Sequence, residues 1–183
     1  MPYGAVVRWE RLFADLEAQL AAARLADDRA GLADLVRAEL ATVALADRLR
    51  AAVGSSIALR VGDLPGERDA VVRGDVVDVG AGWVLIGSPW AKQALVPMAA
   101  VVAVGGLPVD VAPPAGPVES RLGLGHALRA LARDREQVRV CTSAREMVGR
   151  LERVGADHVD VVGGRPAAAW TVPLAAIRVV RAG

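Results

Sequence analysis

Residues 74–84 read GDVVDVGAGWV, and residues 149–159 read GRLERVGADHV, a second version of the same stretch 75 positions later. Both stretches begin with a glycine, carry apolar residues at the third and sixth positions, and reach another glycine at the seventh. The stretch VPMAAV at 96–101 recurs in the same way as VPLAAI at 172–177. Repetition over this distance indicates that the chain contains two copies of one structural unit.

Short runs rich in β-branched residues surround both copies of the repeat, and such runs are typical of β-strands. The first copy contains runs at 57–61, 70–79, 83–87, 93–96 and 101–104. The second copy contains runs at 137–142, 146–154, 158–162, 168–172 and 177–181. Gly74 and Gly149 lie in the longest run of each copy, where a glycine permits the bend that closes a small barrel. The sequence therefore predicts two five-stranded units.

Helical patterns precede each unit. The stripe Trp9, Leu12, Phe13, Leu16 and Leu20 has helical spacing, the polar run DDRAG at 27–31 interrupts it, and a second helical pattern extends over 32–53. These features predict an N-terminal helical hairpin over residues 1–53. A further helical pattern at 120–133 precedes the second set of strands, and its Leu124 and Leu128 match Leu45 and Leu49 of the hairpin.

The predicted fold is α+β and mainly β, with four segments. They are the helical hairpin at 1–53, the first barrel at 54–108, a linker at 109–118, and a helix followed by the second barrel at 119–183. The linker contains three prolines and one glycine, a composition typical of an extended connection. Its reach allows the barrels to pair edge to edge, through 93–96 or 168–172 on one side and 101–104 or 177–181 on the other.

Composition excludes several classes of protein. The chain has 183 residues, 54% of them hydrophobic and 23% charged, with a net charge of +1, so it is long and apolar enough to bury a core. A single cysteine excludes a disulfide scaffold. No apolar run reaches the ~18 residues of a membrane span, and the first residues lack a signal-peptide pattern, so we expect a cytoplasmic protein without membrane contact.

The second repeat, from His126 to Arg181, resembles the Sm-like fold, especially its bacterial Hfq branch. The resemblance lies in the position of the helix, the strand order, the glycine at 149 and the closing turn VPLAAI at 172–177. The whole arrangement also resembles an actinobacterial family whose members open with WERLFADLEAQL, found here at 9–20. These resemblances imply two tandem Sm-like barrels and RNA binding.

The RNA-binding motifs of those families are not matched. Hfq proteins carry a Tyr-Lys-His triplet before the last strand, where this chain has Thr-Val-Pro at 171–173. Sm proteins carry an Asp-x-x-x-Asn pattern after the second strand, where the two repeats have Gly-Ala-Gly-Trp at 80–83 and Gly-Ala-Asp-His at 155–158. No binding residue is therefore carried over from either family.

Residues 118–183 carry a net charge of +4, whereas residues 54–117 carry −2, so candidate nucleic-acid contacts lie in the second repeat. Four arginines are suited to phosphate, and an Asp-His pair occupies the turn where Sm relatives present RNA-binding groups. These candidates are Arg129, Arg133, Arg139, Arg153, Asp157 and His158. The alternative is a salt-bridged surface, because acidic residues are interleaved with the arginines. Trp90 and Trp170 either stack on bases or pack against a barrel end.

No catalytic set can be assembled. His126 and His158 lie in different elements, Cys141 lies inside a predicted strand without a paired histidine, and the glycines at 123 and 125 lack a P-loop or dinucleotide pattern. We therefore expect no enzymatic activity, no cofactor and no metal site.

The sequence predicts a non-catalytic, regulatory protein that binds RNA or another single-stranded nucleic acid. The alternative is a protein-interaction or assembly module that docks a partner at the hairpin or the barrel edges. We expect a monomer or a dimer, because the apolar stripe of the hairpin can cover an outer barrel edge.

Overall fold

The structure is a computed structural model, and it describes residues 6–62, 64, 70–87, 92–164 and 168–182, without the side chains of residues 6–12, 33 and 36. The chain divides into two compact units, one ending at Val43 and the other beginning at Ala44. Trp90, which the sequence offers as a stacking or packing residue, lies outside the described residues.

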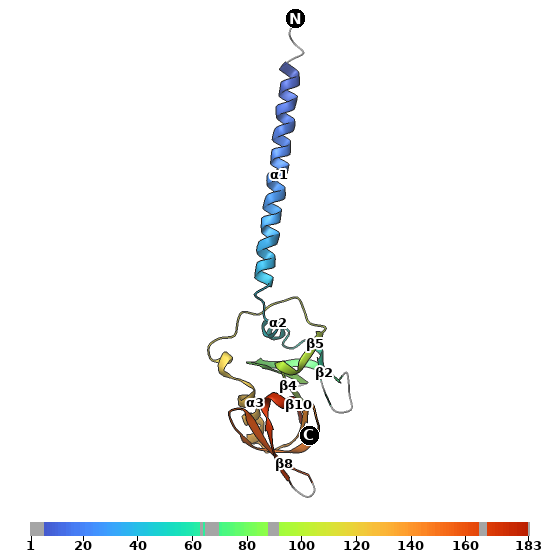
Figure 1. The fold of residues 1–183 in the computed structure, drawn as a ribbon, viewed down its shortest axis with the longest axis vertical. Coiled ribbons are helices and arrows are strands. Elements are labelled where there is room, and N and C mark those ends of the chain that lie inside the picture. Colours follow the sequence, from blue (N-terminus) through green and yellow to red (C-terminus); the bar gives the residue numbers. More distant parts are fainter. Residues whose placement is uncertain (1–5, 63, 65–69, 88–91, 165–167, 183) are drawn as a thin grey trace. The chain divides into compact units, whose positions relative to one another are not determined.

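The first unit is a single helix, α1 (Val6–Leu40), which continues without a break through residues 27–31 (Figure 1). The predicted hairpin with a turn at DDRAG is therefore wrong. A glycine inside a helix costs only about 1 kcal/mol, and the polar side chains of this run remain in solvent, so nothing here forces a turn. The apolar side chains of Phe13, Leu16 and Leu20 are all more than half exposed.

The second unit begins with the short helix α2 (Leu45–Ala51) and continues with the first set of strands. These are β1 (Ser56–Val61), β2 (Ala70–Gly80), β3 (Trp83–Gly87), β4 (Ala94–Pro97) and β5 (Val101–Gly105), with the 3-10 turn η1 (Met98–Ala100) before β5. We call β1–β5 the N-half sheet. Its five predicted strands are confirmed to within one residue at each end.

The second set of strands follows the turn η2 (Glu119–Arg121) and the helix α3 (Leu124–Asp134). The strands are β6 (Gln137–Thr142), β7 (Glu146–Val154), β8 (His158–Gly163), β9 (Ala168–Pro173) and β10 (Ile177–Ala182), with the turn η3 (Leu174–Ala176) before β10. We call β6–β10 the C-half sheet. Its predicted strands are also confirmed to within one residue at each end.

All ten strands form one antiparallel sheet in the order β5-β1-β2-β3-β4-β10-β6-β7-β8-β9. The order within the C-half sheet repeats the order within the N-half sheet, and their register shifts occur at equivalent places, at Val77 and Glu152 and again at Val102 and Arg178. The structure therefore does not contain the two separate, closed barrels that the sequence predicts. The sheet is continuous and open, because β10 pairs with β4 while β5 and β9 are left as edges.

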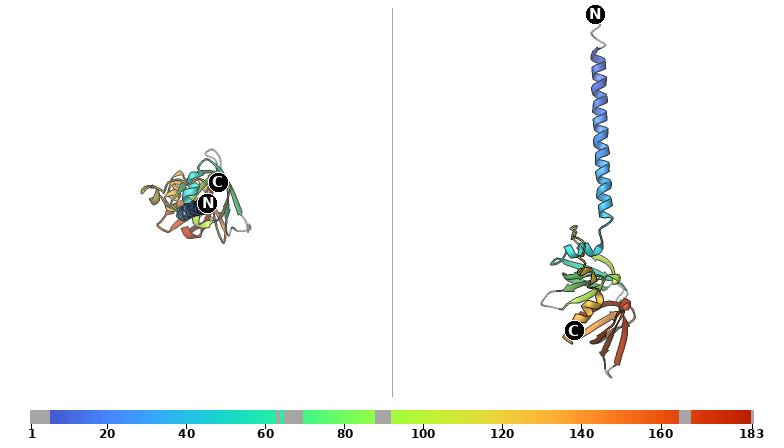
Figure 2. Two further views of the ribbon diagram at one scale, coloured as in Figure 1. Left: turned by 90° about the horizontal axis from the view of Figure 1, so that it is seen from above. Right: turned by 90° about the vertical axis from the view of Figure 1, so that its left-hand side faces the viewer.

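The pairing of β4 with β10, which we call the junction, joins the two half-sheets side by side (Figure 2). Leu95 lies opposite Val180, and Ala94 lies opposite Arg181. Side chains also cross the junction in both directions. The C-half core contains Trp83 and Leu95 of the N-half sheet, and the N-half core contains Cys141 and Val179 of the C-half sheet.

A helix precedes each half-sheet, as the repeat predicts, and it packs against the second strand of that half-sheet. Leu49 of α2 is fully buried in the N-half core, and the equivalent Leu128 of α3 is fully buried in the C-half core. Each leucine supplies an apolar side chain that covers one face of a bent sheet, and burial of this kind contributes roughly 1.5–3 kcal/mol per side chain.

The connection between the halves, residues 106–118, contains no helix or strand, but it is held against α2. The guanidinium groups of Arg48 and Arg50 donate to the carbonyls of Pro108 and Pro113, each over 2.8 Å. The amide of Ala112 donates to the carbonyl of Asp47 over 3.1 Å. The Pro-rich stretch is therefore an anchored connection within the second unit.

Gly149 is required by the close approach of β7 to β8. A Cβ atom at this position would lie 2.5 Å from the carbonyl oxygen of Val162, with the backbone of Gly163 also close to it. Val148, the preceding residue, is 42% exposed and faces solvent. The equivalent Gly74 of β2 has a φ of +156°, and a Cβ atom added there would lie 3.2 Å from the backbone of Gly87.

We expect Gly149→Val to destabilise the second unit by about 2–3 kcal/mol, because the added side chain must displace the backbone of β8. Val148→Ala should change the free energy of unfolding by less than about 0.5 kcal/mol, as exposed positions usually do. Urea denaturation followed by circular dichroism measures both. Equal unfolding midpoints for the two variants would contradict the role given to Gly149.

The two outer edges of the sheet differ chemically from the junction. By strand register, the positions of Trp83 and Leu95 are taken in the C-half sheet by His158 and Thr171. The positions of Cys141 and Val179 are taken in the N-half sheet by Arg60 and Ala103. The four apolar side chains that cross the junction are thus replaced at the outer edges by polar or smaller ones, which disfavours the addition of further half-sheets.

We therefore expect light scattering on the full chain to give the mass of one or two chains. A variant that restores the junction residues at both edges, Arg60→Cys, Ala103→Val, His158→Trp and Thr171→Leu, should give a mass of three or more chains. A wild-type mass of three or more chains would show that the polar edges do not stop growth.

Candidate functional site

The turn between β7 and β8 brings together three of the predicted residues. Arg129 of α3 donates to the carbonyl of Gly155 over 3.1 Å, and the imidazole Nδ1 of His158 lies 2.8 Å from a carboxylate oxygen of Asp157. The hydrogen bond with His158 holds the pKa of the Asp157 carboxyl below its ordinary value. An ionised, fully exposed carboxylate repels phosphate, so this turn is poorly suited to a nucleic-acid backbone.

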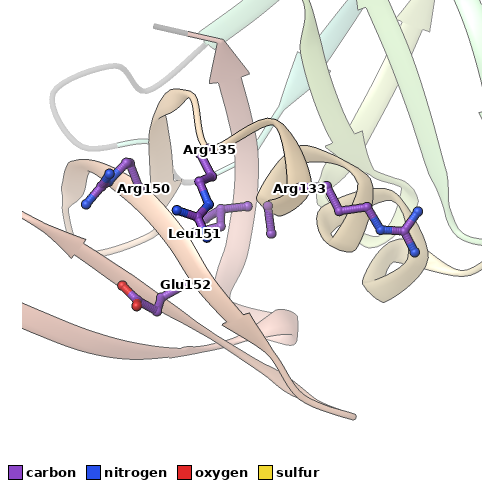
Figure 3. Close-up of a pocket in the computed structure, with 6 residues that line it drawn as sticks. Arg133, Arg135, Arg150, Leu151 and Glu152 are labelled. Carbon is purple, nitrogen blue, oxygen red and sulfur yellow. The ribbon is translucent and has the colours of Figure 1, made fainter.

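A cavity of about 500 Å³ lies between the end of α3 and the middle of β7 (Figure 3). It is lined by Ala132, Arg133, Arg135, Arg150, Leu151 and Glu152. Arg133 points away from Arg135 and Arg150, so the three guanidinium groups do not converge on one point (Figure 3). Arg135 ends α3 in the left-handed conformation, and the partial negative charge of a helix C-terminus attracts cations by itself. Arg133 and Arg135, at the C-terminal end of α3, therefore have a structural explanation.

A second cavity, of about 360 Å³, lies where the two half-sheets meet, and we call it the junction cavity. Four of its lining side chains are cationic, and none of the described residues that line it is acidic. The cations are Arg73 at β2, Lys92 before β4, Arg139 on β6 and Arg181 on β10. Two of them come from each half of the chain, so the site exists only because β4 pairs with β10.

Like charges face each other inside the junction cavity. Arg139 and Arg181 are directly opposite on β6 and β10, an arrangement that destabilises a sheet unless the charges are compensated. Glu146 compensates one of them, since its carboxylate lies 2.9 Å from the guanidinium of Arg139. Within the described part of the chain, no carboxylate forms an ion pair with Arg73, Lys92 or Arg181. The cavity therefore has an excess of positive charge.

The six predicted residues fall at separate places. Arg129, Asp157 and His158 meet at the β7–β8 turn, Arg133 lies at the end of α3, and Arg139 lies in the junction cavity. Arg153 is exposed on β7 and lines none of the described cavities. Sequence reasoning missed Arg73, Lys92 and Arg181. For Lys92 and Arg181 the sequence did contain a signal. One of the predicted edge pairings, 93–96 with 177–181, brings these two residues close together.

Cys141 is buried, as predicted, at 3% exposure. Burial raises the pKa of its thiol, which keeps it protonated and a poor nucleophile at neutral pH. Its sulfur lies 3.7 Å from a carboxylate oxygen of Glu146, the same residue that binds Arg139. Among the described residues there is no group of three or more His, Cys, Asp or Glu side chains placed to hold a metal ion.

The chain matches no protein-family model, no curated protein and no solved structure. Within the described residues, none of the helices combines the length and the apolar character needed to cross a membrane. The function of the chain is therefore inferred from the geometry and charge of its own side chains.

Proposed function

We propose that this chain binds single-stranded RNA through the junction cavity, as a non-catalytic and regulatory protein of the cytoplasm. The observation that carries the proposal is the convergence of Arg73, Lys92, Arg139 and Arg181 on one cavity whose described lining contains no carboxylate. An anionic ligand relieves the repulsion between Arg139 and Arg181, so its binding is favoured by the charges already in place.

A nucleic-acid backbone fits this cavity better than a single small anion does. The cations come from three strands and from the segment before β4, and a chain of phosphates can contact several of them at once. Arginine also forms two parallel hydrogen bonds with one phosphate, which lysine cannot do. Three of the four cations are arginines.

Single-stranded RNA is the nucleic acid favoured by the resemblance of the second repeat to Sm-like proteins. The repeated strand order, with a helix before each half-sheet, supports that resemblance at the level of topology. The motifs at 155–158 and 171–173 still differ from those families. We therefore propose the junction cavity, rather than the pockets of Sm or Hfq proteins, as the binding site.

We expect binding of a fluorescently labelled, uridine- or adenine-rich single strand to weaken as salt increases, because phosphate contacts release counterions. Arg73→Gln and Lys92→Gln should each lower affinity about fivefold, the equivalent of about 1 kcal/mol. Each should also reduce the slope of log K against log salt by about 0.7. Fluorescence anisotropy measures both quantities.

Arg153→Gln is the matched control, because it removes the same charge from an exposed strand position outside the described cavities. Its affinity should stay within twofold of the wild type. An equal loss for Arg153→Gln and Arg73→Gln would mean that binding is nonspecific and does not use the junction cavity. Absence of binding to any single strand at low salt would contradict the proposed function itself.

A second candidate function, a protein-interaction module, is favoured by the exposed apolar side chains of α1. Phe13, Leu16 and Leu20 form one stripe near the start of the helix, while Leu32 and Leu35 form another near its end. A helix of this kind gains stability when it packs its apolar residues against another helix.

If α1 associates with the α1 of a second copy, the wild-type chain should sediment as a dimer, and Leu16→Glu with Leu20→Glu should return it to one chain. Ala18→Glu places one glutamate on the opposite face of the helix and should leave the dimer intact. A wild-type chain that sediments as a monomer at all concentrations would contradict this role for α1.

A further inference from the structure

Trp170 is a large aromatic side chain placed on an outer edge strand, β9, where it is 47% exposed. The fold does not require it. The equivalent position in the N-half sheet is Ala94, which is 8% exposed and lies within the junction. The C-half sheet therefore presents an indole ring to solvent at a position where its own repeat partner has only a methyl group.

Arg145 fixes the position of this ring. Its guanidinium carbon lies 4.5 Å from the centroid of the Trp170 indole, a cation–π contact that covers one face of the ring. A held aromatic ring loses little conformational entropy when a ligand stacks on it. Trp170 is thus a preorganised flat surface with a positive charge beside it.

A small cavity of about 170 Å³ adjoins the ring. Its lining combines apolar side chains, a carboxylate and two glycines. Besides Arg145 and Trp170, it is lined by Glu146, Met147, Val148, Val161, Gly163 and Gly164. An aromatic face beside both polar and apolar groups suits a planar heterocycle that also forms hydrogen bonds.

One ion pair links this small cavity to the junction cavity. Glu146 lines the small cavity, Arg139 lines the junction cavity, and the two side chains are in contact over 2.9 Å. The aromatic surface and the cationic cavity are therefore neighbours on the C-half sheet. A single strand whose phosphates lie near Arg139 and Arg181 can place a base against Trp170.

We propose that Trp170, held by Arg145, is the stacking platform for one base of a single-stranded RNA. This proposal rests on the proposed function, since it assigns the phosphates of the same strand to the junction cavity. It adds what the cations alone cannot supply, namely recognition of a nucleobase. Stacking on an aromatic ring tolerates any base, because every base has a π-face.

The test compares two polyanions on the full chain. A single-stranded oligouridine of about 12 residues, a length within the usual range of single-strand sites, offers phosphates and bases. Inorganic polyphosphate offers charge without bases. Trp170→Ala should lower the affinity for oligouridine by about 5- to 150-fold, as loss of a stacking residue does, and should leave the affinity for polyphosphate within twofold. Trp170→Phe, which keeps an aromatic ring, should restore most of the lost affinity.

The outcomes separate this proposal from the proposed function. If oligouridine binds Trp170→Ala as tightly as the wild type, the platform serves another occupant, such as an apolar side chain of a protein partner, and the stacking proposal is overturned while the junction cavity stands. If the wild type binds neither polyanion, the proposed function fails and the platform with it. Binding of polyphosphate alone overturns the assignment to RNA.

Ultraviolet cross-linking of oligouridine to the wild-type chain gives a second measurement that does not depend on how a variant folds. A cross-link mapped to Trp170 supports the platform. Cross-links mapped only to other residues overturn it.

Discussion

Strand β4 pairs with strand β10, and the rest of the second unit depends on this contact. The directly paired residues are few, with Leu95 opposite Val180 and Ala94 opposite Arg181. Stability at the junction comes largely from the side chains that cross it, since Trp83 is buried in the C-half core and Val179 in the N-half core. Each half-sheet completes the core of the other, so the two repeats fold as one body.

The same pairing creates the candidate binding site. Arg73 and Lys92 come from the first repeat, whose net charge is negative, whereas Arg139 and Arg181 come from the second. Neither repeat alone contains the cluster. The cost of bringing Arg139 opposite Arg181 is partly offset by Glu146, which binds Arg139 and contacts the sulfur of Cys141. A charged site of this kind persists because the apolar contacts of the junction hold its members together.

The two repeats place different side chains at the junction and at the outer edge of β9. In the first repeat, Trp83 and Leu95 lie at the junction. In the second repeat, His158 and Thr171 occupy the equivalent positions near the outer edge of β9. Polar side chains at an edge limit further strand pairing. An edge strand that is not covered by another sheet can present a side chain such as Trp170 to a ligand.

The sequence by itself determined the repeat, the ten strands and the helix before each half-sheet. The signals for them are the alternation of apolar residues, the turn glycines and the VPxAA motif. These signals are local and do not depend on distant contacts. It also indicated that Cys141 is buried. It did not determine that α1 runs through residues 27–31, since a polar run with one glycine is compatible with either a turn or an exposed helix. The tertiary structure alone decided which of the alternative edge pairings forms. It therefore decided which arginines meet, because the proximity of Arg73 to Arg181 depends on strand order and not on any spacing along the chain.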